Sequence, residues 1–253
     1  MKKIALSVVI PCYDEMANLQ KGVLDKVAHF LNKKKIMYEV IVVDDGSKDG
    51  SVEFLKQFVK DNPNFQLLKG DHYGKAGAVT RGMLEAQGDL VLFTDMDQAV
   101  PIEDLDKLLP YFDEGYDVVI GSRGIVRKGA PWTRLLMSRG MIFLRKLIVG
   151  LPNINDTQCG FKMFTRNAAQ ELFSKLTKLH KGFHVIGGSN VAAGFDVELL
   201  YLAEKCDYSI KEVPVKWLYV ETRRVNPVFD SIEGLRGLFR IRRKALLGVY
   251  RNL

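Results

Sequence analysis

The sequence predicts an α/β fold in which a mostly parallel sheet is covered by helices on both faces. Over the first 120 residues, short runs rich in β-branched residues alternate with helical stretches, and such alternation requires right-handed crossovers between parallel strands. The length of 253 residues accommodates one large domain or two small ones. With 47% hydrophobic and 26% charged residues, the composition is that of a globular protein.

The elements follow from local patterns. The predicted strands are residues 4–10, 38–43, 65–69, 89–94 and 117–121. The predicted helices are residues 15–34, 50–61, 76–87, 103–114, 132–150 and 228–250, with another beginning near Asp196. The first apolar run ends at Pro11 and continues into acidic residues, so we interpret it as a strand and not as a signal peptide. We find no uncharged apolar stretch of about 18 residues, so no membrane-spanning helix is predicted.

Polar and turn-forming residues follow each predicted strand. They are Pro11 to Glu15, Asp44 to Ser47, Gly70 to Gly77, Thr94 to Asp97, and Gly121 to Arg123. Ligands of parallel α/β sheets bind at the carboxyl ends of the strands. The sequence therefore predicts one ligand site at this edge of the sheet.

Asp95 and Asp97 are candidate metal ligands. They end a buried apolar strand, where two carboxylates repel each other unless a cation joins them. Hard divalent ions prefer such oxygens, and Mg²⁺ is commonly bound by one or two carboxylates together with substrate phosphates. A second Asp-x-Asp, formed by Asp104 and Asp106, lies in the opening turns of a helix, where acidic residues are favourable without any function.

Two further segments allow more than one interpretation. Asp44 and Asp45 either form a turn that caps the next helix or accept hydrogen bonds from a nucleobase or ribose. Lys75, among small residues at the start of a helix, suits a phosphate. The chain has no GxGxxG after its first strand, no GxxxxGK[ST], no HExxH and no paired CxxC, which argues against dinucleotide, P-loop and zinc sites. Its three widely spaced cysteines favour a reducing compartment.

Positive charge is concentrated in two segments of a chain with net charge +7. Residues 118–155 hold seven basic and no acidic side chains, and residues 223–253 hold eight basic and two acidic ones. Such segments indicate an anionic partner, either a phosphate, a membrane surface or a nucleic acid. The two basic helices are either ordinary surface helices or interfacial helices that lie among anionic lipid headgroups. Around residues 228–250 we expect Arg236, Arg240 and Arg243 on one face and the apolar residues on the other.

Seven motifs, in this order, resemble the inverting family-2 glycosyltransferases. They are VVIPCYDE, VIVVDDGSKDGS, GKAGAVTRGM, LFTDMDQAVP, VVIGSR, DTQCGFKMF and FDVELLYLAE. The resemblance covers nearly the whole chain and is greatest to the dolichyl-phosphate β-glucosyltransferase group, with the dolichyl-phosphate mannose synthases as relatives. It implies a GT-A (Rossmann-like) fold, a divalent metal (Mg²⁺ or Mn²⁺), and transfer of a hexose from a nucleoside-diphosphate sugar to a polyprenyl phosphate. Mannose synthases typically carry Gln at the position of Ala99, so UDP-glucose is the favoured donor.

The resemblance also implies residue roles. The nucleoside is expected to contact Pro11, Tyr13, Glu15, Asp44 and Asp45. Lys75 and Arg81 match the nucleotide-site segment, and Asp95 and Asp97 match the metal and donor-sugar motif, with Asp97 catalytic. The acceptor phosphate is expected to bind Arg123, also catalytic, with Arg134 and Ser138, and Lys162 as a further candidate. Asp196 is a possible base or orienting group.

The expected function is metal-dependent, inverting transfer of a hexose to a polyprenyl phosphate at the cytoplasmic face of a membrane. The expected organisation is a catalytic domain over residues 1–222 and a basic amphipathic segment over residues 223–253 that contacts an anionic membrane surface. Alternatives are a mannose synthase that uses GDP-mannose, and a soluble glycosyltransferase that acts on a sugar hydroxyl with Asp196 as base. A non-catalytic binding module would leave the acidic pair unexplained, and the absence of basic strands interleaved with aromatic residues argues against a nucleic-acid partner.

Overall fold

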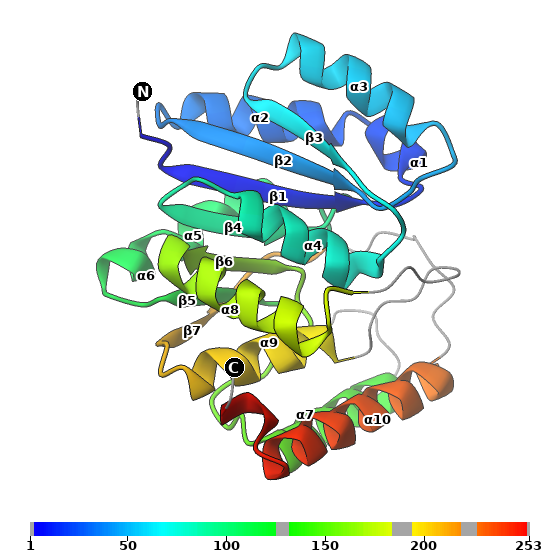
Figure 1. Ribbon diagram of the computed structural model, residues 1–253, viewed down its shortest axis with the longest axis vertical. Helices are drawn as coiled ribbons and strands as arrows, with labels where there is room; N and C mark the ends of the chain where they lie inside the picture. Colours follow the sequence, from blue (N-terminus) through cyan, green and yellow to red (C-terminus); the bar gives the residue numbers. More distant parts are fainter. Residues whose placement is uncertain (1–2, 125–131, 184–193, 219–226, 252–253) are drawn as a thin grey trace.

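A seven-stranded sheet forms the centre of the computed structural model (Figure 1), with the strand order β3-β2-β1-β4-β6-β5-β7. The structure describes residues 3–124, 132–183, 194–218 and 227–251, and for residues 132–139 and 227–231 it describes the backbone alone. Neighbouring strands are parallel except at β6, which is antiparallel to both β4 and β5. The predicted mostly parallel α/β fold is confirmed.

The strands are β1 (Leu6–Cys12), β2 (Tyr38–Asp44), β3 (Phe65–Lys69), β4 (Leu90–Thr94), β5 (Val118–Ser122), β6 (Phe161–Thr165) and β7 (Ile210–Pro214). The α-helices are α1 (Met16–Leu19), α2 (Val23–Lys33), α3 (Ser51–Asp61), α4 (Gly74–Glu85), α5 (Leu105–Leu108), α6 (Pro110–Asp113), α7 (Trp132–Val149), α8 (Arg166–Leu179), α9 (Phe195–Lys205) and α10 (Pro227–Leu246). Short 3₁₀ helices, η1 (Ile102–Asp104) and η2 (Val249–Arg251), complete the described elements.

All five predicted strands are present, but β1 lies two residues later than predicted and ends at Cys12. The strands β6 and β7 and the helix α8 were not predicted. In β6 the fully buried Lys162 interrupts an apolar run, so the hydrophobicity pattern does not indicate a strand there. In β7, an edge strand of only five residues, two consecutive charged residues, Lys211 and Glu212, interrupt the apolar pattern.

Helices cover both faces of the sheet. On one face α4, α8 and α9 pack on alternate strand residues such as Val43 and Phe93. On the other face α2, α3 and α5 pack on the intervening residues, such as Val42 and Leu92. Because successive side chains of a strand point to opposite faces, a sheet buried on both faces requires continuous apolar strands, as found in β1, β2 and β4.

The two basic helices, α7 and α10, lie side by side at the end of the molecule opposite α3 (Figure 1). Leu238 and Ile241 of α10 join the core beneath α9, so this helix packs on the body of the protein. The predicted boundary between residues 222 and 223 lies outside the described residues. Among the described residues, none of the helices combines the length and apolar character needed to cross a bilayer.

The predicted division of α10 into one basic and one apolar face is only partly correct. Leu238 is buried, but Ile232, Phe239 and Leu246 are exposed on the same helix as the exposed Arg240. Only a narrow stripe of the apolar side chains of α10, including Leu238 and Ile241, packs into the core. Apolar and basic side chains therefore share the exposed side of α10.

Candidate active site

The ends of β1, β2, β4 and β5 bring the predicted site residues to one edge of the sheet. The parallel strands β2, β1 and β4 end there at Asp44, Cys12 and Thr94. Since β4 and β5 are both antiparallel to β6, they run in the same direction, and Arg123 follows β5 at this edge. The expected clustering of Pro11, Asp44, the Asp95–Asp97 pair and Arg123 along a single edge follows from this topology.

An aromatic pair marks the β1 and β3 side of the site. The Tyr13 and His72 rings are stacked, with centroids 4.0 Å apart and an interplanar angle of 13°. Nδ1 of His72 lies 2.7 Å from Oδ2 of Asp45, whose Oδ1 accepts a hydrogen bond from the Tyr73 N–H at 2.8 Å. Burial raises the pKa of Asp45 above its usual value, although both contacts oppose the shift. His72 was not among the predicted site residues, because a single histidine within the Gly70–Gly77 segment gives no partner pattern.

Asp44 both forms a turn and retains a hydrogen-bond acceptor. Its Oδ2 accepts from the N–H groups of Gly46 and Ser47 at 3.1 and 3.4 Å, so the predicted turn is present. Its Oδ1 is buried and has no hydrogen-bond partner among the described residues. A buried carboxylate oxygen without a donor is costly, and such an atom is suited to accept a hydrogen bond from a ligand.

The loops after β1 and β2 are bonded to each other, which fixes Tyr13 and Glu15 at the site. The Glu15 N–H donates to Oγ of Ser51 at 3.1 Å, and the Met16 N–H donates to Oδ2 of Asp49 at 2.8 Å. Neither Ser51 nor Asp49 was singled out in the sequence, because their partners lie more than thirty residues away. Pro11, within β1, is paired with Val43.

Lys75 is the cation of an acidic cluster at the end of β4. Its Nζ lies 2.5 Å from Oδ1 of Asp95. Burial tends to lower the pKa of Lys75, but the charges of Asp95, Asp196 and Asp97 outweigh it, so this pKa lies above the usual value. Burial and the charge of Asp95 raise the pKa of Asp97. A hydrogen bond from the Ala99 N–H (3.0 Å) and the charge of Lys75 oppose this shift. Arg81, by contrast, donates to the Lys69 carbonyl beyond this cluster.

Gly160 leaves space for the Asp95 carboxylate. A Cβ added at Gly160 would lie 2.0 Å from Oδ2 and 2.6 Å from Cγ of Asp95. Any side chain at this position would therefore displace Asp95. The loop that carries Gly160, which leads into β6, is part of the wall of the site.

The acidic pair has the donor set of a divalent cation site. The Asp95 side chain is 36% exposed and Asp97 is partly buried. Within the described ranges no group of three or more His, Cys, Asp or Glu side chains could hold a metal ion. Two carboxylates leave most coordination positions to water or to a ligand, as is usual for Mg²⁺ sites that act on phosphates. The residues present therefore fit a cation that is bound jointly with an anionic ligand.

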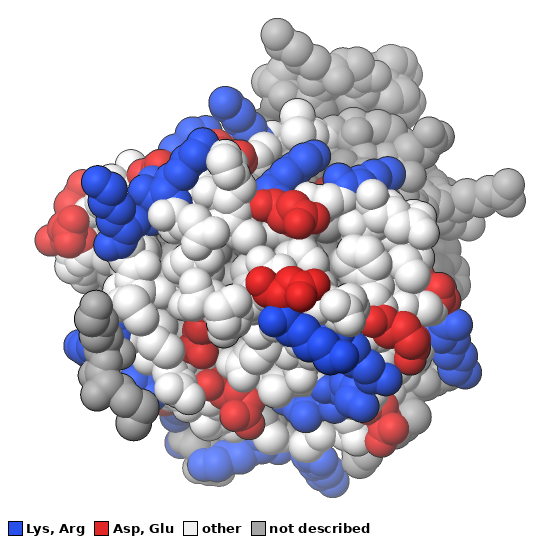
Figure 2. Space-filling view, turned by 90° about the horizontal axis from the view of Figure 1, so that it is seen from above, with Lys and Arg blue, Asp and Glu red and all other residues white. Residues whose placement is uncertain are grey.

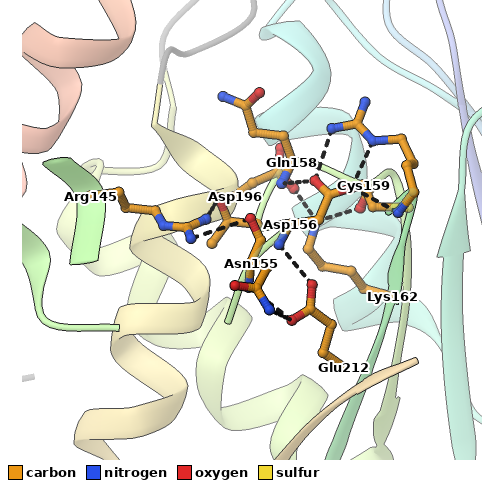
Figure 3. Close-up of polar contacts among 10 residues, drawn as sticks. Arg145, Asn155, Asp156, Gln158, Cys159, Lys162, Asp196 and Glu212 are labelled. Carbon is orange, nitrogen blue, oxygen red and sulfur yellow. Dashed lines mark hydrogen bonds and ion pairs between the residues drawn. The ribbon is translucent and has the colours of Figure 1, made fainter. Parts of the chain in front are cut away.

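Arg123 is held by Asp156, the residue labelled in Figure 3. Asp156 accepts from Nε, Nη2 and the backbone N–H of Arg123 at 2.8, 2.9 and 3.0 Å. Although burial opposes it, the Arg123 guanidinium lowers the pKa of Asp156 to about 2. Asp156 was not a predicted site residue. The side chains of Arg134 and Ser138, both in α7, lie outside the described residues.

The fully buried Lys162 forms an ion pair with the partly buried Asp196 (Figure 3). Nζ of Lys162 lies 2.5 Å from Oδ1 of Asp196 and donates to the Cys159 carbonyl at 2.6 Å. Its side chain is fully buried, with Nζ 5.2 Å from the centroid of the Phe93 ring. Lys162 therefore holds Asp196 in place and is not positioned to bind an acceptor phosphate, contrary to expectation.

Comparisons with known proteins agree with this geometry. The family model "Glycosyl transferase family 2" matches residues 7–173. A dolichyl-phosphate beta-glucosyltransferase of Dictyostelium discoideum is 36% identical to this chain, and the alignment covers 98% of this chain and 77% of the relative. One of Homo sapiens is 32% identical, and the alignment covers 97% of this chain and 77% of the relative.

Solved structures share the fold at low identity. A mannosyl-3-phosphoglycerate synthase from Rubrobacter xylanophilus has a TM-score of 0.67 at 17% identity, over 97% of this chain and 75% of its own. A mannosyltransferase from Pyrobaculum calidifontis, solved with GDP-Man and Mn²⁺, has a TM-score of 0.56 at 17% identity, over 99% and 76%. The family match over most of the chain and the relatives above 30% identity lead to one conclusion: the chain belongs to glycosyltransferase family 2.

Proposed function

We propose that the protein transfers glucose from UDP-glucose to a polyprenyl phosphate such as dolichyl phosphate. The observation that carries the proposal is the order of groups along the sheet edge. Asp44 ends β2 and Asp45 follows it, and Tyr13 follows β1. The acidic pair follows β4 and is joined by Lys75 of α4, and Arg123 follows β5. A nucleoside, a diphosphate and an acceptor phosphate, bound in this order, would each meet groups of matching chemistry.

The nucleoside would bind at the Tyr13 and Asp44 end. The buried Oδ1 of Asp44 is available to accept a hydrogen bond from a base N–H or a ribose hydroxyl. The stacked Tyr13 and His72 rings offer a flat apolar surface, with His72 fixed by Asp45. Pro11 and Glu15 complete this end of the site in the proposal.

Asp95 and Asp97 would hold Mg²⁺ or Mn²⁺. The cation would supply charge neutralisation for the diphosphate leaving group. Lys75, next to Asp95, adds a positive charge that stabilises the same developing negative charge. Asp95 and Lys75 pair with each other when no ligand is bound, and Asp97 remains as the second carboxylate available to the cation.

The acceptor phosphate would bind at Arg123, with Arg134 and Ser138 as further ligands. A phosphate monoester has a second pKa near 6, so at neutral pH it is already an anionic nucleophile and needs no strong general base. Asp196, paired with Lys162, is accordingly an orienting group in this proposal. Direct displacement by the phosphate oxygen inverts the anomeric carbon and gives a β-linked product from an α-linked donor.

Replacing Gly160 with alanine tests the space that Asp95 requires. The added methyl group would displace the Asp95 carboxylate by about 1 Å, and misplacement on that scale costs on the order of 10²-fold in rate. We expect kcat for glucosyl transfer to fall accordingly. The control is Gly140→Ala, where an added Cβ meets no atom within 4 Å. Equal activity of the two variants would show that Asp95 does not need its present position.

The face formed by α7 and α10 is the proposed contact with an anionic membrane surface, on its cytoplasmic side. Phe143, Leu147, Phe239 and Leu246 are 66%, 70%, 57% and 73% exposed there, together with basic side chains such as Arg240. Apolar side chains among arginines and lysines suit the headgroup region of anionic bilayers. The opposite end, around α2 and α3, carries intermixed Lys, Arg, Asp and Glu (Figure 2).

All three cysteines are free, as suits a reducing compartment.

Binding to vesicles tests this surface. The double variant Phe239→Ser and Leu246→Ser should weaken binding to phosphatidylserine-containing vesicles at least ~10-fold, because each buried apolar side chain contributes about 1.5–3 kcal/mol. Ile36 and Met37, exposed between α2 and β2, provide the matched control variant Ile36→Ser and Met37→Ser. Co-sedimentation of all three proteins measures the effect. Equal binding by both double variants would place the membrane contact elsewhere.

The donor is tested by transfer of labelled sugar into organic-extractable lipid. Purified protein is incubated with a polyprenyl phosphate, detergent, Mg²⁺ and labelled UDP-glucose or GDP-mannose in parallel, with EDTA as control. EDTA-sensitive label from UDP-glucose alone is the expected result. Label from GDP-mannose alone would assign the mannose-transferring alternative, and no lipid label with either donor would contradict the proposal.

A further inference from the structure

The loop between α7 and β6 is held from two sides by buried or half-buried charged residues. Two consecutive peptide units of this loop, Ile154–Asn155 and Asn155–Asp156, have both their C=O and their N–H groups bonded to side chains (Figure 3). All the carbonyl bonds come from Arg145, and all the amide bonds go to Glu212. Neither residue belongs to the proposed set of ligand-binding residues.

Arg145 and Glu212, with the backbone of residues 154–156 between them, are called the clamp below. Nη2 of Arg145 donates to the carbonyls of Ile154 and Asn155 at 2.6 and 3.3 Å. Oε2 and Oε1 of Glu212 accept from the N–H groups of Asn155 and Asp156 at 2.8 and 2.7 Å. Because the C=O and N–H of a trans peptide point in opposite directions, Arg145 and Glu212 grip the loop from opposite sides.

A carboxylate is needed at residue 212 because the loop presents more donors than an amide could accept. Besides the two backbone N–H groups, Nδ2 of Asn155 donates to Oε2 of Glu212 at 3.1 Å. Both carboxylate oxygens are thus used, and the described residues include no Lys, Arg or His within ion-pair distance of Glu212. A glutamine would offer one acceptor oxygen and would turn an NH₂ group towards a backbone N–H.

The clamp ends at Arg123. Asp156, whose N–H is fixed by Glu212, binds the Arg123 guanidinium through both carboxylate oxygens. Glu212 also lies on β7 opposite Ile120 of β5, three residues before Arg123. Glu212 therefore contacts both the strand that leads to Arg123 and the backbone of Asp156, whose carboxylate orients Arg123.

We propose that Glu212 is a positioning residue for acceptor binding, which sets the orientation of Arg123 through the 155–156 peptide and the Asp156 carboxylate. The proposal rests on the proposed function in that Arg123 is taken to bind the acceptor phosphate. It makes Glu212, far from the motifs in the sequence, a determinant of acceptor affinity and not of donor affinity.

The test compares Glu212→Gln with Glu39→Gln. Glu39, on β2, also accepts from three donors, the Ser7 hydroxyl, the Gln87 N–H and the Gln66 amide, but away from the site edge. Loss of one charge-assisted hydrogen bond in the clamp should raise the apparent KM for polyprenyl phosphate about 10-fold in Glu212→Gln. The KM for the donor should stay unchanged in both variants, and Glu39→Gln should alter neither KM.

A second readout does not depend on catalysis. The ¹H–¹⁵N signal of the Arg123 Nε, assigned with Arg123→Lys, should shift in Glu212→Gln and remain in place in Glu39→Gln. An unshifted signal in a folded Glu212→Gln protein overturns the proposal, whether or not the wild type makes a lipid-linked product. A shifted signal without a change in acceptor KM also overturns it, because Arg123 would then move without consequence for the acceptor.

Absence of wild-type transfer with a shifted signal would contradict the proposed function and support the positioning of Arg123. If Glu212→Gln does not fold, Glu212→Asp, which keeps the charge but is one methylene shorter, is measured in the same way.

Discussion

Replacing Asp97 with asparagine is expected to lower kcat for sugar transfer on the order of 10²- to 10³-fold, as for loss of other groups that stabilise transition-state charge. Asparagine keeps the size of the side chain and an oxygen that can accept the Ala99 N–H bond, so the fold should be retained. It removes one of the two anionic ligands proposed for the cation. Steady-state kinetics, thermal melting and titration with Mn²⁺ measure these three consequences separately.

The chain contains its own control for this variant. Asp106 is the second carboxylate of the other Asp-x-Asp, is 49% exposed and forms an ion pair with Lys34 at the surface. Asp106→Asn should leave kcat and Mn²⁺ affinity unchanged. Comparable losses in both variants, or an active Asp97→Asn protein with normal Mn²⁺ affinity, would contradict the assignment of the acidic pair.

Replacing Glu198 with glutamine should produce the largest loss of stability among the substitutions considered. Glu198, almost fully buried on α9, accepts from His180, Lys244 and Tyr250 at 2.8, 3.0 and 2.6 Å. These partners come from the end of α8, from α10 and from η2, so one carboxylate connects three segments. Breaking a buried ionic cluster by removing one member typically costs about 3–5 kcal/mol, and we expect the free energy of unfolding at pH 7 to fall by about that amount.

The same variant should change the dependence of stability on pH. Burial opposes the charged form of Glu198, but the bonds from His180 and Tyr250 and the charge of Lys244 lower its pKa from 4.5 to about 2. A lowered pKa in the folded state contributes stability above pH 4.5, and this contribution is lost as the pH falls towards 2. Wild-type stability should therefore decline between pH 4.5 and 2 more steeply than that of Glu198→Gln.

Urea unfolding at several pH values measures both effects, with Glu233→Gln as the control. Glu233 pairs with Arg236 at the surface of α10, and exposed pairs of this kind contribute about 0–1 kcal/mol. A Glu198→Gln protein as stable as Glu233→Gln would show that the cluster does not hold the C-terminal segment to α9.

The sequence predicts the sheet edge well because strand ends are local features. The runs before Asp44 and Asp95 are uninterrupted and apolar, and a parallel sheet places their carboxyl ends together whatever the loops do. The second Asp-x-Asp lies in a different environment, because Asp104 is buried and its carboxylate accepts from Lys107 and from the Lys216 N–H.

What the sequence does not predict depends on contacts between distant residues. Glu198 resembles any acidic residue in a first helical turn, yet its partner Tyr250 is 52 residues away. Arg145 counts as one more positive charge of a basic helix, but it is 5% exposed and binds the loop before β6. The number of charges along the chain does not show which way each side chain points. The buried and exposed basic side chains of α7 therefore cannot be told apart until the fold is known.

The identity of the acceptor decides whether this protein transfers glucose to a lipid phosphate. Purified protein is given UDP-glucose, Mg²⁺ and either a polyprenyl phosphate or the polyprenol of the same length, and the lipid product is analysed by mass spectrometry and NMR. We expect a single product, a β-linked glucosyl phosphodiester of the polyprenol, formed from the phosphate alone. Glucose attached to the polyprenol hydroxyl, or an α-linked product, would contradict this expectation.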